Sequence, residues 1–309
     1  MRLSTLTRPQ GANRALIDGD VIAPGFEFDF ADEPVLVKGF RKMVRNLEFD
    51  VAEMALTTYI TAKEHDVAFT ALPIFLVRDF HHGATQTLRS SSDRPIADFA
   101  GGRLGVNRGY TVTTGVWGRA ALAANGLDLE SVTWVCSGEE HVAEYAPPAN
   151  VIGAPEGTTL EEMLLAGELD AVVGAGISHP DVVPLFSDPD GAAAEVLRER
   201  GIFPINHLIV VRDELLASNS DVAHAVFEAF AEAKRIYTAQ LTDLPTDSRQ
   251  NRVLARVTRI TGADPLPYGL EGNRATLEEL IDNAVRQHII RRRPSLEELF
   301  AVDTLELRG

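Results

Sequence analysis

Polar side chains that can move protons or hold anions gather at a few places in the chain. The densest group is Arg78-Asp79-Phe80-His81-His82-Gly83, which directly follows the apolar run 69–75. A guanidinium can hold a carboxylate through two hydrogen bonds, and a histidine can give or take a proton near neutral pH. The candidate site residues here are Arg78, His81 and His82, although a solvated loop without a task would read the same way.

Glu53 and His207 are two further candidates, because each lies beside a strand-like apolar run. Glu53 follows residues 50–52, and His207 opens the run 208–211. A carboxylate at the end of an apolar strand is costly unless something pairs with it. Glu53 would therefore pair with Arg78, face a cleft as a proton acceptor, or mark a helix start. A lone histidine among apolar residues also fits an ordinary place in the core.

The segment 109–117 brings hydroxyl groups to an expected helix start after the apolar run 104–106. Backbone N–H groups and threonine hydroxyls at such a place can bind an anion. Threonines also cap helices without any ligand, and both uses can hold at once. The candidate binding residues of this segment are Tyr110, Thr111, Thr113 and Thr114.

The elements that must position these side chains alternate between short apolar strands and amphipathic helices, which predicts an α/β fold. Strands are expected at residues 67–73, 103–106, 171–173 and 207–211. Capping boxes typical of helix starts stand at Thr159 and Glu162, at Thr276 and Glu279, and at Ser295 and Glu298. Apolar residues at helical spacing fill the segment 221–241 at Val222, Val226, Phe230, Ala233 and Tyr237. Most of the candidate site residues lie next to the expected strands, and open α/β sheets bind ligands at the carboxyl ends of their strands.

One short phrase occurs twice, at residues 47–52 and 167–172. Each copy reads as a helix end, an acidic turn and a buried strand, which favours two similar α/β lobes. The stretch 90–102 is rich in Ser, Asp, Pro and Gly and is the expected lobe boundary, with a second crossing near 201–205.

The expected domain organisation is therefore discontinuous. Residues 1–100 and 206–309 would form lobe 1, and residues 101–205 would form lobe 2. A ligand cleft is expected between the two lobes.

Composition narrows the classes of function. The chain has 309 residues, a net charge of −16 and one cysteine, so it has no intramolecular disulfide, and nucleic acid or an anionic membrane is an unfavourable partner. No apolar run approaches the length of a membrane span, and the first residues lack the apolar core of a signal peptide, so a cytoplasmic location is expected.

Common cofactor signatures are missing from the sequence. It has no phosphate loop, and Gly174-Ala175-Gly176 lacks the third glycine of a dinucleotide loop. His81, His82 and His207 have no regular metal-ligand spacing. We therefore expect neither a cofactor nor a metal.

Several blocks together resemble the 4,5-dihydroxyphthalate decarboxylase family, in the family's order across almost the whole chain. They are residues 48–54, 71–75 with 78–82, 105–106 with 110–117, 201–207 and 267–274. The resemblance implies a type 2 periplasmic-binding-protein fold, with two Rossmann-like α/β lobes joined by two crossover strands. It also implies a cofactor-independent carboxy-lyase of phthalate degradation and aromatic acid catabolism. Its partner would be a small aromatic carboxylate, with no nucleic acid and no membrane, and a homo-oligomer is left open.

The sequence departs from the family pattern at three places. Residues 7–14 replace an Asp-Tyr-Asp-Arg-like stretch, Ala55 stands where serine is common, and His81 stands where arginine is common. These departures leave the exact substrate open more than the fold.

The expected reaction converts 4,5-dihydroxyphthalate to 3,4-dihydroxybenzoate. Such a site needs a cation for a carboxylate, an acceptor for a phenol proton and a proton donor for the ring carbon. Our assignment gives these roles to Arg78, Glu53 and His82, with His207 as a polar wall and with Thr113 and Thr114 holding the second carboxylate. The alternatives are a solute-binding protein for a small organic acid and a related enzyme that acts on another small acid.

Overall fold

The computed structural model describes residues 1–241 and 248–309. The chain divides into two compact units. Unit 1 comprises Met1–Asp79, Ile205–Glu278 and Pro294–Gly309, and unit 2 comprises Phe80–Pro204 and Glu279–Arg293. Within the described part of the chain, no helix combines the length and apolar character needed to cross a membrane.

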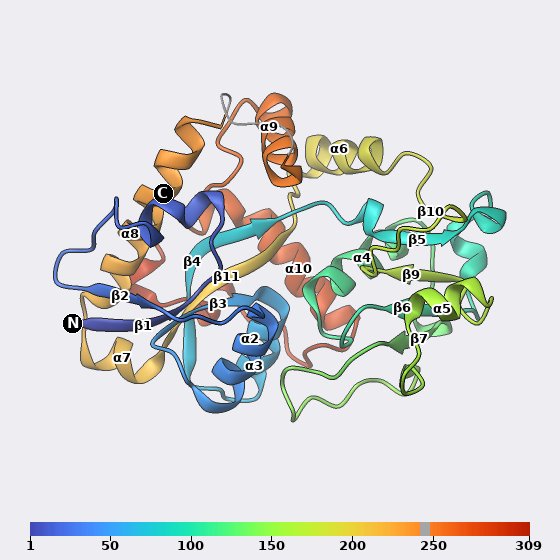
Figure 1. Cartoon of the computed structure of the whole chain (residues 1–309), viewed down its shortest axis with the longest axis horizontal. Helices are drawn as coiled ribbons and strands as arrows, with labels where there is room; N and C mark the ends of the chain where they lie inside the picture. Colours follow the sequence, from blue (N-terminus) through green and yellow to red (C-terminus); the bar gives the residue numbers. More distant parts are fainter. Residues whose placement is uncertain (242–247) are drawn as a thin grey trace. The chain divides into compact units, whose positions relative to one another are not determined.

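Unit 1 is built on a five-stranded mixed sheet with the order β2-β1-β3-β11-β4 (Figure 1). The strands are β1 (Arg2–Leu6), β2 (Glu27–Phe30), β3 (Val51–Ala55), β4 (Phe69–Arg78) and β11 (Ile205–Arg212). β1 runs parallel to β2 and β3, whereas β11 runs antiparallel to β3 and β4. The central strand β3 is buried along its whole length, so the glutamate that it carries lies inside the protein.

Helices and short turns connect these strands. The α-helices of unit 1 are α1 (Arg14–Ile17), α2 (Leu36–Asn46), α3 (Leu56–Glu64), α7 (Asp213–Ser218), α8 (Val222–Ala239), α9 (Arg249–Thr261) and α11 (Leu296–Leu299). Residues of α10 (Arg274–Arg286) belong to both units. The 3-10 helices of unit 1 are η1 (Gly11–Asn13), η6 (Glu271–Asn273) and η7 (Val302–Thr304).

Unit 2 is built on a six-stranded mixed sheet with the order β10-β5-β9-β6-β7-β8. The strands are β5 (Thr85–Leu88), β6 (Arg103–Val106), β7 (Thr133–Cys136), β8 (Val151–Gly153), β9 (Ala171–Val173) and β10 (Val182–Pro184). The helices are α4 (Thr113–Ala124), α5 (Leu160–Leu165), α6 (Pro189–Arg200), η2 (His82–Ala84), η3 (Arg89–Ser91), η4 (Ile96–Phe99) and η5 (Leu129–Ser131).

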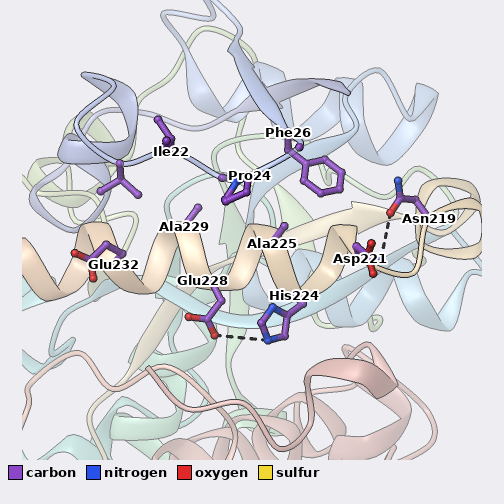
Figure 2. A pocket seen from close by; sticks show the side chains of 13 residues that line it. Ile22, Pro24, Phe26, Asn219, Asp221, His224, Ala225, Glu228, Ala229 and Glu232 are labelled. Carbon is purple, nitrogen blue, oxygen red and sulfur yellow. Dashed lines mark hydrogen bonds and ion pairs between the residues drawn. The ribbon is translucent and has the colours of Figure 1, made fainter.

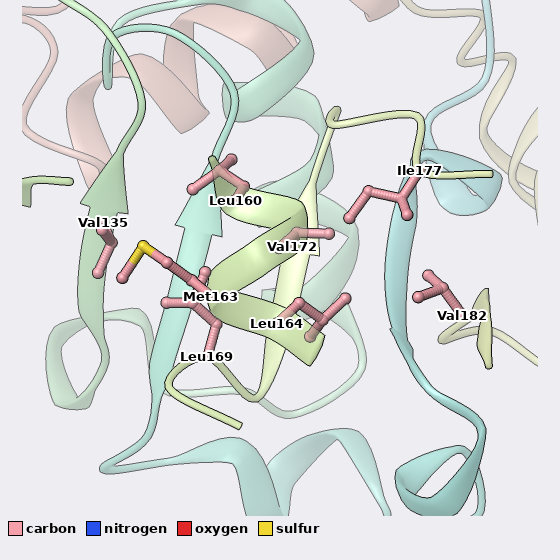
Figure 3. Close-up of a cluster of buried hydrophobic side chains, with 8 residues drawn as sticks. All are labelled: Val135, Leu160, Met163, Leu164, Leu169, Val172, Ile177 and Val182. Carbon is pink, nitrogen blue, oxygen red and sulfur yellow. The ribbon is translucent and has the colours of Figure 1, made fainter. Parts of the chain in front are cut away.

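One face of this sheet is covered by α5. Figure 3 shows Leu160, Met163 and Leu164 of α5 packed among side chains of the strands, including Val135 and Val172. Burial of such apolar side chains contributes about 1.5–3 kcal/mol each, so this cluster is a main source of the stability of unit 2.

The predicted elements agree with the structure in most places. β6 and β9 have the predicted bounds, β11 is longer by three residues, and α8 buries all five residues of its predicted apolar face. The capping boxes at Thr159 and Ser295 are confirmed. The one at Thr276 is wrong, because α10 already begins at Arg274 and Glu279 forms an ion pair with Arg200 at 2.5 Å.

The two units begin at other residues than the expected lobes. Residues 80–100 lie in unit 2, because β5 pairs with β9 and β10 of that sheet. Residues 279–293 also lie in unit 2, and the return to unit 1 falls at Pro204 and Ile205.

Candidate active site

Glu53 and His207 form a buried polar pair in the sheet of unit 1. In the antiparallel register Glu53 lies opposite Ile209, and His207 lies two residues before Ile209 in β11, on the same face. The register of β11 against β4 is irregular on both sides of His207, which re-aims its side chain. His207 Nδ1 lies 2.6 Å from Glu53 Oε1, and Glu53 is 0% exposed.

The second carboxylate oxygen of Glu53 is held by the segment that follows β1. Oε2 accepts hydrogen bonds from the Thr7 hydroxyl at 2.7 Å, the Arg8 backbone N–H at 3.2 Å and the Gln10 side-chain amide at 3.4 Å. The Asn13 side chain supports this turn by donating to Thr7 Oγ1 at 2.9 Å and to the Arg8 carbonyl at 3.0 Å. Both oxygens of Glu53 are therefore occupied.

The electrostatic surroundings keep Glu53 ionised. Burial alone would raise its pKa, but the hydrogen bond and the charge of His207, with smaller contributions from Thr7 and Arg8, outweigh burial and lower the pKa below its usual value. A carboxylate only accepts hydrogen bonds, so His207 Nδ1 donates to it. This hydrogen bond fixes the orientation of the ring, as in other carboxylate–histidine pairs.

The other ring nitrogen of His207 is the one that can meet a ligand. Phe40 packs edge-on against the imidazole, with ring centroids 5.3 Å apart. The His207 side chain is 17% exposed, and its Nε2 has no hydrogen-bond partner within residues 1–241 and 248–309. This pair can accept or return a proton through Nε2 while the buried carboxylate orients the ring and stabilises its charged form.

Arg78 belongs to unit 1 but does not pair with Glu53. It ends β4, and its guanidinium donates to the Asn273 side chain and to the Pro267 carbonyl at 3.5 Å. Burial, against the opposing charge of Asp264, lowers the pKa of Arg78 to about 9. These contacts of its guanidinium hold the turn Pro267–Asn273 against the end of the sheet, which is a structural task.

His81 and His82 lie in unit 2, at η2. Both line a cavity of about 80 Å³, together with Trp117, Arg200 and Glu279. His82 packs edge-on against Phe186, with ring centroids 5.1 Å apart, and its buried Nδ1 has no hydrogen-bond partner among the residues that the structure describes. Burial lowers the pKa of His82, so its imidazole is neutral at pH 7.

The segment before α4 already holds a carboxylate of the chain itself. Glu140 accepts hydrogen bonds from the Tyr110 backbone N–H, from the Thr111 backbone N–H at 3.2 Å and from the Thr111 hydroxyl at 2.5 Å. Thr113 and Thr114 follow as the first two residues of α4. The predicted anion site therefore suits a carboxylate, and the Glu140 side chain already accepts hydrogen bonds from its first two backbone N–H groups.

Arg119 of α4 was not predicted from the sequence. It is 0% exposed, donates to Gln287 at 2.7 Å and to the Tyr110 carbonyl at 2.7 Å, and stacks on the Tyr110 ring at 3.8 Å. This buried guanidinium fixes the backbone that leads into α4.

Among the candidate residues, the structure brings Glu53 and His207 together. It adds Thr7, Gln10 and Asn13, which sequence reasoning missed. Their signal was their place directly after the first strand, since β1 and β3 are parallel and their carboxyl ends meet. Among the side chains of residues 1–241 and 248–309, no three of His, Cys, Asp or Glu are grouped as metal ligands would be.

A separate hollow of about 700 Å³ lies in unit 1 between residues 21–26 and α8 (Figure 2). Ile22, Pro24 and Phe26 line one side, and His224 and Glu228 line the other. None of the residues singled out from the sequence lines it.

Comparison with curated proteins gives two relatives of the same name. A 4,5-dihydroxyphthalate decarboxylase of Comamonas testosteroni is 29% identical over 316 residues, covering 95% of this chain and 94% of the relative. A 4,5-dihydroxyphthalate decarboxylase of Pseudomonas putida is 34% identical over 201 residues, covering 60% of this chain and 77% of the relative. No family model matches the chain.

Solved structures confirm the fold. The periplasmic aliphatic sulphonate binding protein of Escherichia coli matches with a TM-score of 0.54 at 13% identity, covering 97% of this chain and 91% of that one. A Candida albicans protein described as having the generic periplasmic-binding-protein fold matches with a TM-score of 0.55 at 12% identity, covering 100% and 99%. The predicted periplasmic-binding-protein fold and the predicted family are both confirmed: this chain belongs to the 4,5-dihydroxyphthalate decarboxylase family of carboxy-lyases.

Proposed function

We propose that this protein removes one carboxylate from a hydroxylated aromatic dicarboxylic acid, converting 4,5-dihydroxyphthalate to 3,4-dihydroxybenzoate and carbon dioxide without a cofactor. The observation that carries the proposal is the buried Glu53–His207 pair, in a chain whose relatives bear the name of that activity. The earlier expectation that the substrate binds between the two lobes stays a prediction.

The chemistry follows from the substrate. Each carboxylate of 4,5-dihydroxyphthalate is para to one hydroxyl. Loss of that phenol proton pushes electron density to the ring carbon that bears the carboxylate. Protonation of this carbon followed by cleavage of its bond to the carboxylate releases carbon dioxide and restores the aromatic ring. The protein must therefore accept the phenol proton, deliver a proton taken up from solvent to carbon, and return the phenol proton to the oxygen of the product.

His207 suits the first task better than Glu53, to which the sequence assigned it. Glu53 is completely buried and both of its oxygens are occupied, so it has no free atom for a phenol. His207 Nε2 would take the phenol proton, and Glu53 would stabilise the imidazolium that forms. Glu53 is then a positioning residue that acts through His207.

The remaining roles stay proposals in a revised form. Tyr110, Thr111, Thr113, Thr114 and His81 are proposed as substrate-binding residues, and His82 as the donor to the ring carbon. The pKa of His82 is lowered by burial, so it would have to receive its proton in the course of the reaction. Arg78 is better suited to fixing the turn at Pro267 than to holding a substrate carboxylate, because Asn273 engages its guanidinium.

The test is carbon dioxide release from chelator-treated protein offered 4,5-dihydroxyphthalate and a panel of hydroxylated benzoates. We expect release from the wild type and a loss of about 100- to 10,000-fold in His207→Gln, the range for a general base. His224→Gln, at an exposed histidine of α8, is the matched control and should keep full activity. No release from any acid in the panel, or full activity in His207→Gln, would contradict the proposal.

A solute-binding protein is the second candidate, and the match to the aliphatic sulphonate binding protein favours it on fold. The same fold also matches a desulfurization enzyme, with a TM-score of 0.51 at 14% identity. Binding of an aromatic acid with no carbon dioxide release over many hours would support the binding protein instead.

A further inference from the structure

Arg8 has a fixed backbone and a free side chain. Its N–H donates to Glu53 Oε2 at 3.2 Å, and its carbonyl accepts from the Asn13 side chain at 3.0 Å. Pro9 follows and restricts the next backbone angle. The Cα–Cβ direction of Arg8 is therefore set by the same contacts that hold the buried carboxylate.

The guanidinium of Arg8 forms no hydrogen bond or ion pair in the described part of the chain, although its positive charge helps to lower the pKa of Glu53. Arg2 and Arg14, in the same stretch, form ion pairs with Asp29 and Asp18. Glu53 accepts a hydrogen bond from the Arg8 backbone, but its two carboxylate oxygens already bind the side chains of His207 and Thr7. An exposed guanidinium that forms no ion pair within the described part of the chain is available to an anion from outside.

Arg8 also stands where this kind of sheet binds ligands. The order β2-β1-β3-β11-β4 places the strands that follow β1 on opposite sides of it, so the topology switches between β1 and β3. Ligands of open α/β sheets bind outside the carboxyl ends of the strands at such a switch point. Arg8 lies two residues after β1, and Glu53 lies in β3.

We propose that the Arg8 guanidinium binds the carboxylate of the aromatic acid that stays on the ring, beside the Glu53–His207 pair. A bidentate guanidinium–carboxylate contact would fix the ring in its plane and set which hydroxyl meets His207 Nε2. The inference rests on the proposed function for the identity of the acid.

The chemistry points to the carboxylate that stays rather than the one that leaves. A cation bound to the leaving carboxylate would stabilise the ground state, whose charge moves into the ring as the bond breaks. A cation on the carboxylate that remains on the ring does not raise the activation barrier of that step. The product 3,4-dihydroxybenzoate keeps this carboxylate, so the product should depend on Arg8 as strongly as the substrate does.

The test measures binding by calorimetry, which needs no turnover. The probes are 3,4-dihydroxybenzoate and catechol, which has the same hydroxyls and no carboxylate. We expect Arg8→Gln to weaken binding of the acid by about 10- to 100-fold, as for hydrogen bonds to a charged group, and to leave catechol unchanged. Arg8→Lys should recover part of the loss, because it keeps the charge and loses the fork.

Arg14→Gln is the matched control, since it removes an arginine from the same segment whose charge is already paired with Asp18. It should bind the acid like the wild type. Equal binding of the acid by wild type and Arg8→Gln would overturn the proposal, as would an equal loss for catechol, or no binding of the acid by the wild type. Arg8-dependent binding without any carbon dioxide release would keep the Arg8 site and remove the proposed activity.

Discussion

Each unit contains the same kind of junction, in which an aspartate stands directly before a buried strand and binds the neighbouring strand. Asp50 precedes β3 and Asp170 precedes β9. Each carboxylate accepts from a backbone N–H of the neighbouring strand, Ser4 at 2.9 Å and Arg103 at 3.0 Å. Each aspartate N–H donates back to the carbonyl of that same residue, at 2.9 and 2.8 Å. The second oxygen of each pairs with an arginine, Arg212 for Asp50 and Arg94 for Asp170.

The strands that follow these junctions then differ in one respect. Three residues after the aspartate, β3 carries Glu53 and β9 carries Val173. Beside them stand Thr7, directly after β1, in unit 1 and Val106 of β6 in unit 2. Unit 2 shows that the junction needs only apolar side chains here. This difference supports the role proposed for the buried carboxylate of unit 1, since a desolvated charge is costly to keep.

The strongest test of this difference places the valines of unit 2 at the matching positions of unit 1. We expect Thr7→Val/Glu53→Val to reduce kcat for carbon dioxide release by about 100- to 10,000-fold. The free energy of unfolding should fall by about 1–3 kcal/mol, because His207 Nδ1 and the Arg8 N–H lose their acceptor. Steady-state kinetics and urea unfolding measure the two effects. Unfolding of the double variant at neutral pH would show that the pair is structural.

A smaller effect is expected from Thr7→Val alone. This change removes one of the hydrogen bonds to Glu53 Oε2 and leaves the bond to His207 in place. We expect kcat to fall by about tenfold, the value of one hydrogen bond to a charged group, with KM little changed. An activity as low as that of the double variant would mean that Thr7 itself takes part in the reaction.

The junctions themselves should respond alike. Asp50→Asn and Asp170→Asn each weaken hydrogen bonds that a carboxylate accepts, so each should lower the free energy of unfolding by about 1–2 kcal/mol. Separate urea titrations of the two variants check this. Losses that differ by more than threefold would show that the two copies are not equivalent.

The smallest expected effect is on the pH dependence of stability. Since the pKa of Glu53 is lowered in the folded protein, its contribution to stability is present above the usual value of 4.5 and is lost as pH falls through the folded value. Unfolding of wild type and Glu53→Gln between pH 6 and 3 should therefore converge below about pH 4.5. A difference in the free energy of unfolding between the two proteins that grows toward low pH would contradict this prediction.

The two junctions could be predicted from the sequence because the signal is local. The phrase 47–52 recurs at 167–172, and helix end, aspartate and strand follow one another within six residues. The capping boxes at Thr159 and Ser295 are local in the same sense, with partners three residues apart. The relatives' family could also be predicted, since its blocks run along the whole chain.

The partners in the site could not be predicted, because they are far apart in sequence. Thr7 and His207 meet Glu53 across separations of 46 and 154 residues, through the pairing of β1 and β11 with β3. β4 extends to Arg78, which the sequence places after the end of the apolar strand, so this arginine joins the sheet and its side chain contacts Asn273. Sheet register decides these contacts, and no local pattern encodes it.

The central claim is that the carboxylate of Glu53 makes unit 1 the place where the proton moves. The most direct test is the rate of carbon dioxide release from 4,5-dihydroxyphthalate by wild type and Glu53→Gln, with binding of 3,4-dihydroxybenzoate measured in parallel. The account predicts a kcat lower by about 100-fold or more in Glu53→Gln, with product binding within about threefold of wild type. Equal kcat values in the two proteins would contradict it.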